Sequence, residues 1–236
     1  MGRYDRPTSP SLIMIHFRKI CDYPRTPTKG DVFEYLCALT KHKIDPPTLH
    51  PRELGITDKV VFASPLKRSR ECLLVRPDTP VFYLDQLKEI PFDLATLCTH
   101  KEWEEQKSTI VRTRFVDAFV ADRLLTPQAM IIHEIRDVLD RLHAQPQISA
   151  TVVSHSFRLK VIEAYIKTQG ALAAQPDLLR TFIRADTPTY AFGKGFDVST
   201  HFALPCHSRV GVSVSNTDIG NLYNNSGSPI ESGMTK

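Results

Sequence analysis

The sequence has few residues that could cross-link the fold. Five cysteines are spread along its 236 residues, and no two of them form a CxxC pair: Cys21, Cys37, Cys72, Cys98 and Cys206. An odd and scattered set of this kind indicates neither a zinc site nor a disulfide framework. We therefore expect five reduced thiols in a cytoplasmic protein that is stabilised by its apolar core.

Long apolar runs and strong charge of one sign are also absent. No run reaches the roughly 18 apolar residues that indicate a membrane-spanning helix. The first ten residues, MGRYDRPTSP, contain no apolar stretch, so we expect no secretory signal. The net charge is only +4, and basic residues are not interleaved with aromatic ones in a stripe. These absences predict a cytoplasmic protein that binds neither membranes nor nucleic acids.

What remains is the composition of an ordinary globular domain. Hydrophobic residues make up 42% of the chain and charged residues 24%, close to the average for soluble proteins. We expect one α/β domain over residues 1–207, with a helical cap or insertion around 91–127. Residues 208–236 are rich in Ser, Asn and Gly and lack apolar periodicity, which predicts a flexible extension.

Short apolar runs predict the strands. LIMIHF at 12–17, VVFASP at 60–65 and SATVVSH at 149–155 are typical of strands buried on both faces of a parallel sheet. A shorter strand is expected at 81–87. The segment 189–205 is expected to supply a further strand or hairpin, whose place in the sheet the sequence does not give.

Helical spacing of apolar residues follows these strands. It predicts helices from Asp31 to about His42, from Leu66 onward, and over 129–144 and 157–170. The apolar face of the helix at 129–144 is expected to contain Ile132, Ile135, Val138, Leu139 and Leu142. Alternation of buried strands with helices predicts a three-layer α/β/α fold with a mostly parallel central sheet.

Residues with useful chemistry follow the predicted strands. His16 follows LIMI, Ser64 and Arg68 follow VVFA, His155 follows TVVS, and Glu89 follows the short strand. Ligands of open parallel sheets bind outside the carboxyl ends of the strands, so we expect these residues to share a site. Each one alone has a plainer interpretation, such as a loop histidine, a surface arginine or a carboxylate that caps a turn. The prediction depends on their combination and order.

Four segments resemble those of the histidine phosphatase superfamily, in the family's order. ASPLKRSRECLL at 63–74 is similar to the family's Ser-Ser-Pro-Leu-x-Arg-Ala segment, and TVVSHSFRLKVI at 151–162 resembles the segment of its second histidine. DYPRTPTKGDVFEYLCAL at 22–39 resembles the Pro-Leu-Thr-x-x-Gly stretch and the helix after it. YLDQLKEI at 83–90 is similar to the segment that carries the acidic residue. The resemblance covers about residues 12–165 and implies a phosphoglycerate mutase-like fold.

The resemblance also implies a reaction. It implies that this chain is a metal-independent phosphohydrolase. His16 would attack phosphorus and form a phosphohistidine intermediate. Arg68 would hold the phosphoryl oxygens, with His155 as a further donor if it is protonated, and Glu89 would protonate the leaving oxygen and then activate water. No cofactor is required. The expected partner is a small phosphorylated substrate, and a homodimer is the one protein assembly considered.

The first motif departs from the family's pattern. Where the family has Arg-His-Gly, this chain has Ile15, His16 and Phe17. Losing one charge-assisted contact costs about 2–4 kcal/mol in a transition state, and Phe17 replaces a glycine that lets the backbone approach phosphate. Arg18 and Lys19 follow directly and could restore the lost charge, and one hypothesis is that Arg18 enters the pocket and replaces the missing arginine. The alternative is that Arg18 lies in solvent.

Two other functions therefore stay open. The chain could be a non-catalytic phosphate-ligand-binding or interaction module on the same fold, which the altered first motif favours. The scaffold could also serve a non-hydrolytic reaction, with Phe17 making the pocket suitable for a hydrophobic phosphate or diphosphate ester. The joint presence of His16, Arg68, Glu89 and His155 favours the hydrolase.

Overall fold

The computed structural model describes most of the predicted domain. The described residues are 14–19, 25–27, 30–49, 52–144, 149–172 and 192–199. All of them belong to the first of two units into which the chain divides, Met1–Leu204 and Pro205–Lys236. The predicted flexible extension over 208–236 lies outside the described residues.

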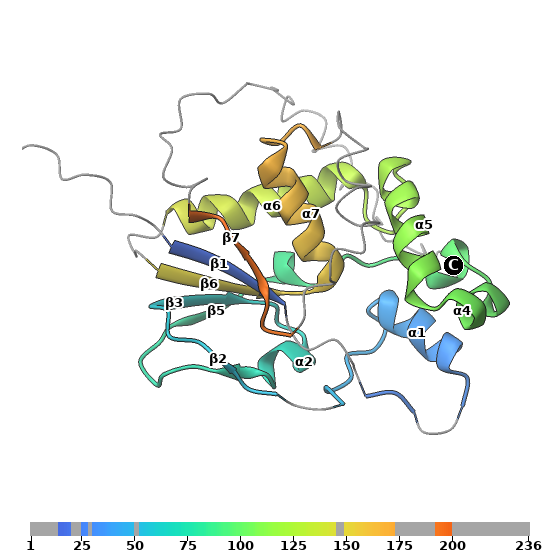
Figure 1. Ribbon diagram of the computed structural model, residues 1–236, viewed down its shortest axis with the longest axis horizontal. Helices are drawn as coiled ribbons and strands as arrows, with labels where there is room; N and C mark the ends of the chain where they lie inside the picture. The colour runs from blue at the N-terminus through green and yellow to red at the C-terminus, as the bar shows by residue number, and fades with distance from the viewer. Residues whose placement is uncertain are drawn as a thin grey trace, which may run out of the picture. The chain divides into compact units, whose positions relative to one another are not determined.

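A five-stranded sheet is the centre of this mixed α/β fold, and its strand order is β5-β3-β6-β1-β7 (Figure 1). The strands are β1 (Met14–Lys19), β3 (Val60–Ala63), β5 (Val81–Tyr83), β6 (Ser149–Ser154) and β7 (Gly195–Asp197). Neighbours among the first four are parallel, whereas β7 runs antiparallel to β1. Two further strands, β2 (Leu54–Gly55) and β4 (Leu73–Leu74), form a separate parallel pair. The prediction of a mostly parallel central sheet is confirmed.

Seven α-helices and one short 3₁₀ helix, Asp85–Leu87, lie in the described part of the chain. The α-helices are α1 (Val32–Thr40), α2 (Lys67–Arg70), α3 (Leu94–Leu97), α4 (His100–Gln106), α5 (Ser108–Val120), α6 (Gln128–His143) and α7 (Ser156–Lys167). Helices α3, α4 and α5 are the helical pieces predicted between the short strand and the long amphipathic helix. Within the described ranges, no helix has the length and apolar character needed to cross a membrane.

Strand β1 ends two residues later than the sequence predicted. The apolar run suggested an end at Phe17, but the ladder continues through Arg18 and Lys19, so His16 lies inside the strand and not at its end. The reason is that β1 is paired on both sides. Its residues pair with β6 up to Ser154, and the segment before β7 accepts a hydrogen bond of 3.0 Å from the Lys19 backbone N–H.

Helix α2 is also shorter than predicted. Instead of continuing through LKRSRECLL, the helix ends at Arg70 after one turn, and the chain then enters β4. The carbonyl of Cys72 accepts a hydrogen bond of 2.7 Å from the N–H of Leu54. This tertiary pairing holds the backbone extended where local spacing had suggested a helix.

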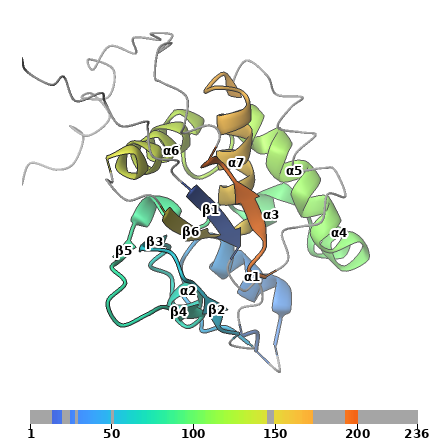
Figure 2. The same ribbon diagram turned by 60° about the vertical axis from the view of Figure 1, so that its left-hand side comes forward.

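Alternate side chains of β3 pack into two apolar clusters. Val60 and Phe62 join the large cluster that also contains the buried residues of α6 and α7, whereas Val61 and Ala63 pack with Cys72 and the strands β2 and β4. Because successive strand residues point to opposite faces, both faces of this strand are buried, as its apolar run predicted. Figure 2 shows α6 and α7 together above the sheet.

The buried face of α6 is rotated slightly from the predicted one. The fully buried residues are Ile131, Ile135, Val138 and Leu142, which follow helical spacing. The predicted members Ile132 and Leu139 are only partly buried at the edge of the same cluster. The N-terminus of α1 is as predicted, since the Asp31 carboxylate accepts hydrogen bonds from the N–H groups of Phe33 and Glu34 at 2.8 and 3.2 Å.

β7 is the further strand that was expected from the segment 189–205. It lies at the edge of the sheet, beside β1. Gly195 lies so close to β1 that a Cβ atom on it would be 1.6 Å from the Phe17 carbonyl oxygen. The rings of Phe196 and Phe17 stack, with centroids 5.0 Å apart. β7 therefore depends on a glycine at this position.

We expect the substitution Gly195→Ala to destabilise the fold by about 1–3 kcal/mol, because β7 would have to move away from β1. The measurement is urea unfolding followed by circular dichroism. Gly55→Ala is the matched control, since Gly55 also lies in a strand and a Cβ there would meet no atom within 4 Å. Equal unfolding midpoints for the two variants would contradict the close packing of β7 on β1.

Candidate functional site

The carboxyl ends of three neighbouring parallel strands meet at one edge of the sheet. Strand β6 lies between β3 and β1, with Ala63 paired to Val153 and Lys19 paired to Ser154. The residues that follow β3 and β6, which are Ser64 and His155, therefore lie next to each other and near the end of β1. This edge is where ligands of open parallel sheets bind.

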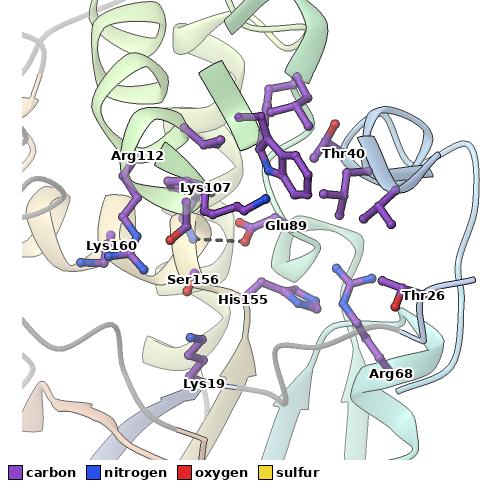
Figure 3. A pocket seen from close by; sticks show the side chains of 18 residues that line it. Lys19, Thr26, Thr40, Arg68, Glu89, Lys107, Arg112, His155, Ser156 and Lys160 are labelled. Carbon is purple, nitrogen blue, oxygen red and sulfur yellow. Dashed lines mark hydrogen bonds between the residues drawn. The ribbon is translucent and has the colours of Figure 1, made fainter. Parts of the chain in front are cut away.

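A cavity of about 570 Å³ opens at this edge (Figure 3). Its size is that of a site for a small organic ligand. The cavity is lined by the end of β1, by α1, α4, α5 and the N-terminal half of α7, and by residues from the loops between strands and helices.

The structure brings three of the five predicted site residues together. Arg68, Glu89 and His155 all line the cavity. Arg18 is not among its lining residues. The backbone of His16 lies in the middle of β1, paired with Thr151 of β6, and the position of its side chain lies outside what the structure describes.

His155 is buried, with 3% of its surface exposed, and directly precedes α7. Its Nε2 lies 2.8 Å from the Ser64 hydroxyl oxygen, which also accepts a hydrogen bond of 3.3 Å from the Leu66 N–H. Burial, and then the positive charge of Arg68, hold the pKa of His155 well below 6.5. This low pKa favours a neutral imidazole at pH 7, so the condition under which His155 would add a further charged donor, its protonation, is not favoured in the empty cavity.

Glu89 connects the cavity to the start of α7. Its carboxylate accepts hydrogen bonds from the backbone N–H groups of Arg158, Ile90 and Phe157, at 2.8, 3.1 and 3.2 Å. Burial raises the pKa of Glu89, and these three N–H groups offset part of that rise. The carboxyl therefore caps the helix and also holds a proton more readily than an exposed glutamate does.

Arg68 lies on α2 with 8% of its surface exposed. Its guanidinium is 4.0 Å from a carboxylate oxygen of Asp45. It lowers the pKa of His155 and also that of His42, which burial and Arg68 bring to about 4. This arginine is therefore the main positive charge on the β3 side of the cavity.

Lys19, and not Arg18, is the residue of this basic pair that lines the cavity. It is the last residue of β1, is 3% exposed and lines the cavity. Since successive strand residues point to opposite faces, Lys19 and Arg18 cannot both face the cavity. The signal was available in the alternation of Ile15, Phe17 and Lys19, which share one face once the strand is extended to its true end.

Three further cations that line the cavity were not predicted from the sequence. Lys107 directly precedes α5, Arg112 lies in the first half of α5, and Lys160 comes from α7. Lys160 is 5% exposed, and burial, followed by the charges of Arg112 and Lys19, lowers its pKa. In the sequence, single basic residues on amphipathic helices resemble solvent-exposed ones, so only the fold reveals this group.

Seven apolar residues also line the cavity. They are Val32, Leu36, Phe92, Leu94, Trp103, Val111 and Phe157. Phe17, which the sequence suggested for this purpose, is instead fully buried in the core against Phe196. The cavity is therefore partly apolar, but for a different reason than the one predicted.

The charges of the cavity favour an anionic ligand. Among its described lining residues, five are lysine or arginine and one, Glu89, is a carboxylate. Cations held away from water favour a bound anion, because an anion replaces the lost solvation. In the described ranges, no cluster of three or more His, Cys, Asp or Glu side chains could hold a metal ion.

Comparison with known proteins adds no assignment to this geometry. No model of a known protein family matches the sequence, and a search of curated proteins finds no significant match either. The chemistry of the cavity has to be inferred from its residues.

The depressed pKa values predict a loss of stability in acid. Below pH 6.5 an unfolded chain binds a proton at His155 that the folded chain does not, so the free energy of unfolding falls as the pH is lowered from 6.5. One fully buried histidine contributes at most about 1.4 kcal/mol per pH unit.

The measurement is urea unfolding at several pH values between about 6.5 and 4. We expect His155→Gln to reduce the pH dependence, and His133→Gln, at an exposed position of α6, to leave it unchanged. The same pH dependence in His155→Gln and in the unsubstituted protein would contradict a buried neutral imidazole.

Proposed function

We propose that this chain is a phosphohydrolase that binds an organic phosphate ester in the cavity. The observation that carries the proposal is the convergence of Lys19, Arg68, His155 and Glu89 at the ends of three parallel strands. The resemblance of the segments around Arg68, Glu89 and His155 to histidine phosphatases supports it independently. The mixed α/β fold is compatible with the three-layer, phosphoglycerate mutase-like arrangement of that superfamily.

The phosphoryl group would lie between Lys19 and Arg68. A guanidinium donates two parallel hydrogen bonds to phosphoryl oxygens, and a buried ammonium adds charge at short range. The neutral imidazole of His155 donates one hydrogen bond at most, so the two cations supply most of the electrostatic stabilisation. Such donors lower the barrier when negative charge develops on the phosphoryl oxygens.

Glu89 has the properties of the acid in this reaction. Its raised pKa keeps a proton available for the leaving oxygen, and the resulting carboxylate can then accept a proton from the attacking water. Its hydrogen bonds to three backbone N–H groups fix its position relative to His155.

The nucleophile is assigned differently by resemblance and by geometry. Resemblance assigns it to His16, whose backbone lies three residues, or about 10 Å, before the end of β1. Geometry favours His155, because it lines the cavity and its low pKa leaves a ring nitrogen unprotonated. In either case the nitrogen forms a bond to phosphorus as the alcohol leaves with the proton from Glu89.

Two observations favour a second function. The strand-end position next to His155 is occupied by Lys19, which cannot act as the histidine nucleophile, and Glu89 already has a structural task at the start of α7. A non-catalytic module would use the same cavity to bind a phosphorylated ligand without turnover.

Phosphate release from a panel of monoesters and diphosphates, without added metal, tests the function. We expect Arg68→Ala to lower kcat/KM by about 10²–10³, with Arg68→Lys in between, because a charge-assisted contact to the transition state is lost. Arg76→Ala, at an exposed position, is the control and should have no effect. Unchanged turnover in Arg68→Ala would contradict the site, and ligand binding without any turnover would support the module.

The covalent intermediate identifies the nucleophile. We expect rapid quenching of a reaction with ³²P-labelled substrate to trap acid-labile label on the protein, as phosphohistidine requires. His16→Ala and His155→Ala should differ, with the label lost in only one of them. A label that survives in both variants would contradict both assignments.

A further inference from the structure

The cations of the cavity form two groups on opposite sides of it. Figure 3 shows Arg68 on one side and Arg112 with Lys160 on the other, with His155 and Ser156 between them. Arg68 comes from α2, the short helix after β3, whereas Arg112 and Lys160 come from α5 and α7. One phosphoryl group at His155 therefore does not use all of the positive charge.

The second group is held together at an electrostatic cost. Lys160 is 5% exposed, and Arg112 is the first of the neighbouring charges that make its protonated form less favourable. Glu163 opposes this effect in part, but its carboxylate also lies 2.7 Å from Lys167. Two cations that approach each other from different helices in a buried place are stabilised when an anion lies between them.

The spacing of this group fits a second position on the same ligand. Lys160 is one helical turn, about 6 Å, farther along α7 than Ser156. Arg112 is likewise one turn beyond Ser108 on α5, and both serines line the cavity. A ligand whose first phosphate lies at His155 would thus reach this group through a short carbon chain.

The apolar part of the lining suits such a chain. Trp103, Val111 and Phe157 provide apolar surface in the cavity, and Lys107 lies 4.2 Å from the centre of the Trp103 ring. The volume of about 570 Å³ also leaves room for more than a phosphate group.

We propose that Arg112 and Lys160 form a second anion subsite, so that the natural ligand is an organic phosphate with a second anionic group, a phosphate or a carboxylate, at the other end of a short carbon skeleton. This inference rests on the proposed phosphate site at Arg68 and His155, and it holds for a hydrolase and for a binding module alike.

Three ligands with one carbon chain test the subsite: hexyl phosphate, the bisphosphate of hexanediol, and hexanoic acid phosphorylated at the far end of its chain. Trp103 is the only tryptophan of the protein and lines the cavity, so its fluorescence reports binding without a label. We expect the two ligands with an anionic group at each end to bind about 10- to 100-fold more tightly than hexyl phosphate, because each gains a charge-assisted contact. A preference for the bisphosphate over the carboxylate would identify the second group as a phosphate.

Substitutions localise the preference. Lys160→Met and Arg112→Gln should each reduce the preference by about 10-fold and lower the affinity for hexyl phosphate much less than Arg68→Ala does. Lys101→Met, at an exposed position of α4, is the control and should keep the full preference. Arg112→Gln keeps the test valid if the buried substitution Lys160→Met prevents folding, which circular dichroism would show.

The outcomes separate this inference from the proposed function. Equal affinities for the three ligands in the unsubstituted protein, or a preference that survives in Arg112→Gln, would overturn the second subsite. Selective binding without hydrolysis would keep the subsite and contradict the hydrolase. Loss of hexyl phosphate binding in Arg68→Ala, with a much smaller effect in Arg112→Gln, would support the division of the cavity into two anion positions.

Discussion

The pairing of β1 with β6 is the constraint on which the rest of the site depends. It sets Lys19 opposite Ser154 and so beside His155, and the pairing of β6 with β3 places Ser64 within hydrogen-bonding distance of the same imidazole. Helix α7 starts from this point, and Glu89 fixes its N-terminus through backbone hydrogen bonds. A shift of β1 by one residue would turn Lys19 away from the cavity, because strand side chains alternate between faces.

The cavity concentrates positive charge in places that water reaches poorly. Burial and the charge of Arg68 lower the pKa of His155. Burial and the neighbouring cations lower the pKa of Lys160. A bound anion would stabilise the folded protein, since it compensates these buried charges and replaces their lost solvation. The apolar residues of the lining, such as Trp103 and Phe157, indicate that the anion belongs to an organic molecule.

The site residues that follow buried strands could be predicted from the sequence. Arg68, Glu89 and His155 were predicted together because each follows a strand, and the parallel order of the sheet brings such positions to one edge. The end of β1 was predicted too early. β7 and the residue before it, far along the chain, pair with Arg18 and Lys19 and extend the strand. Lys160 and Arg112 were missed since their helices show amphipathic spacing, and nothing local distinguishes a buried cation from an exposed one.

A crystal structure of the protein with orthovanadate tests the central claim, which is that this cavity binds phosphoryl groups through Lys19, Arg68 and His155. Vanadate resembles phosphate in charge and shape, and it can adopt the geometry of a phosphoryl group in transfer. We expect vanadate between the Lys19 ammonium and the Arg68 guanidinium, within hydrogen-bonding distance of His155. A cavity without vanadate at a concentration that saturates known phosphatases would contradict the claim.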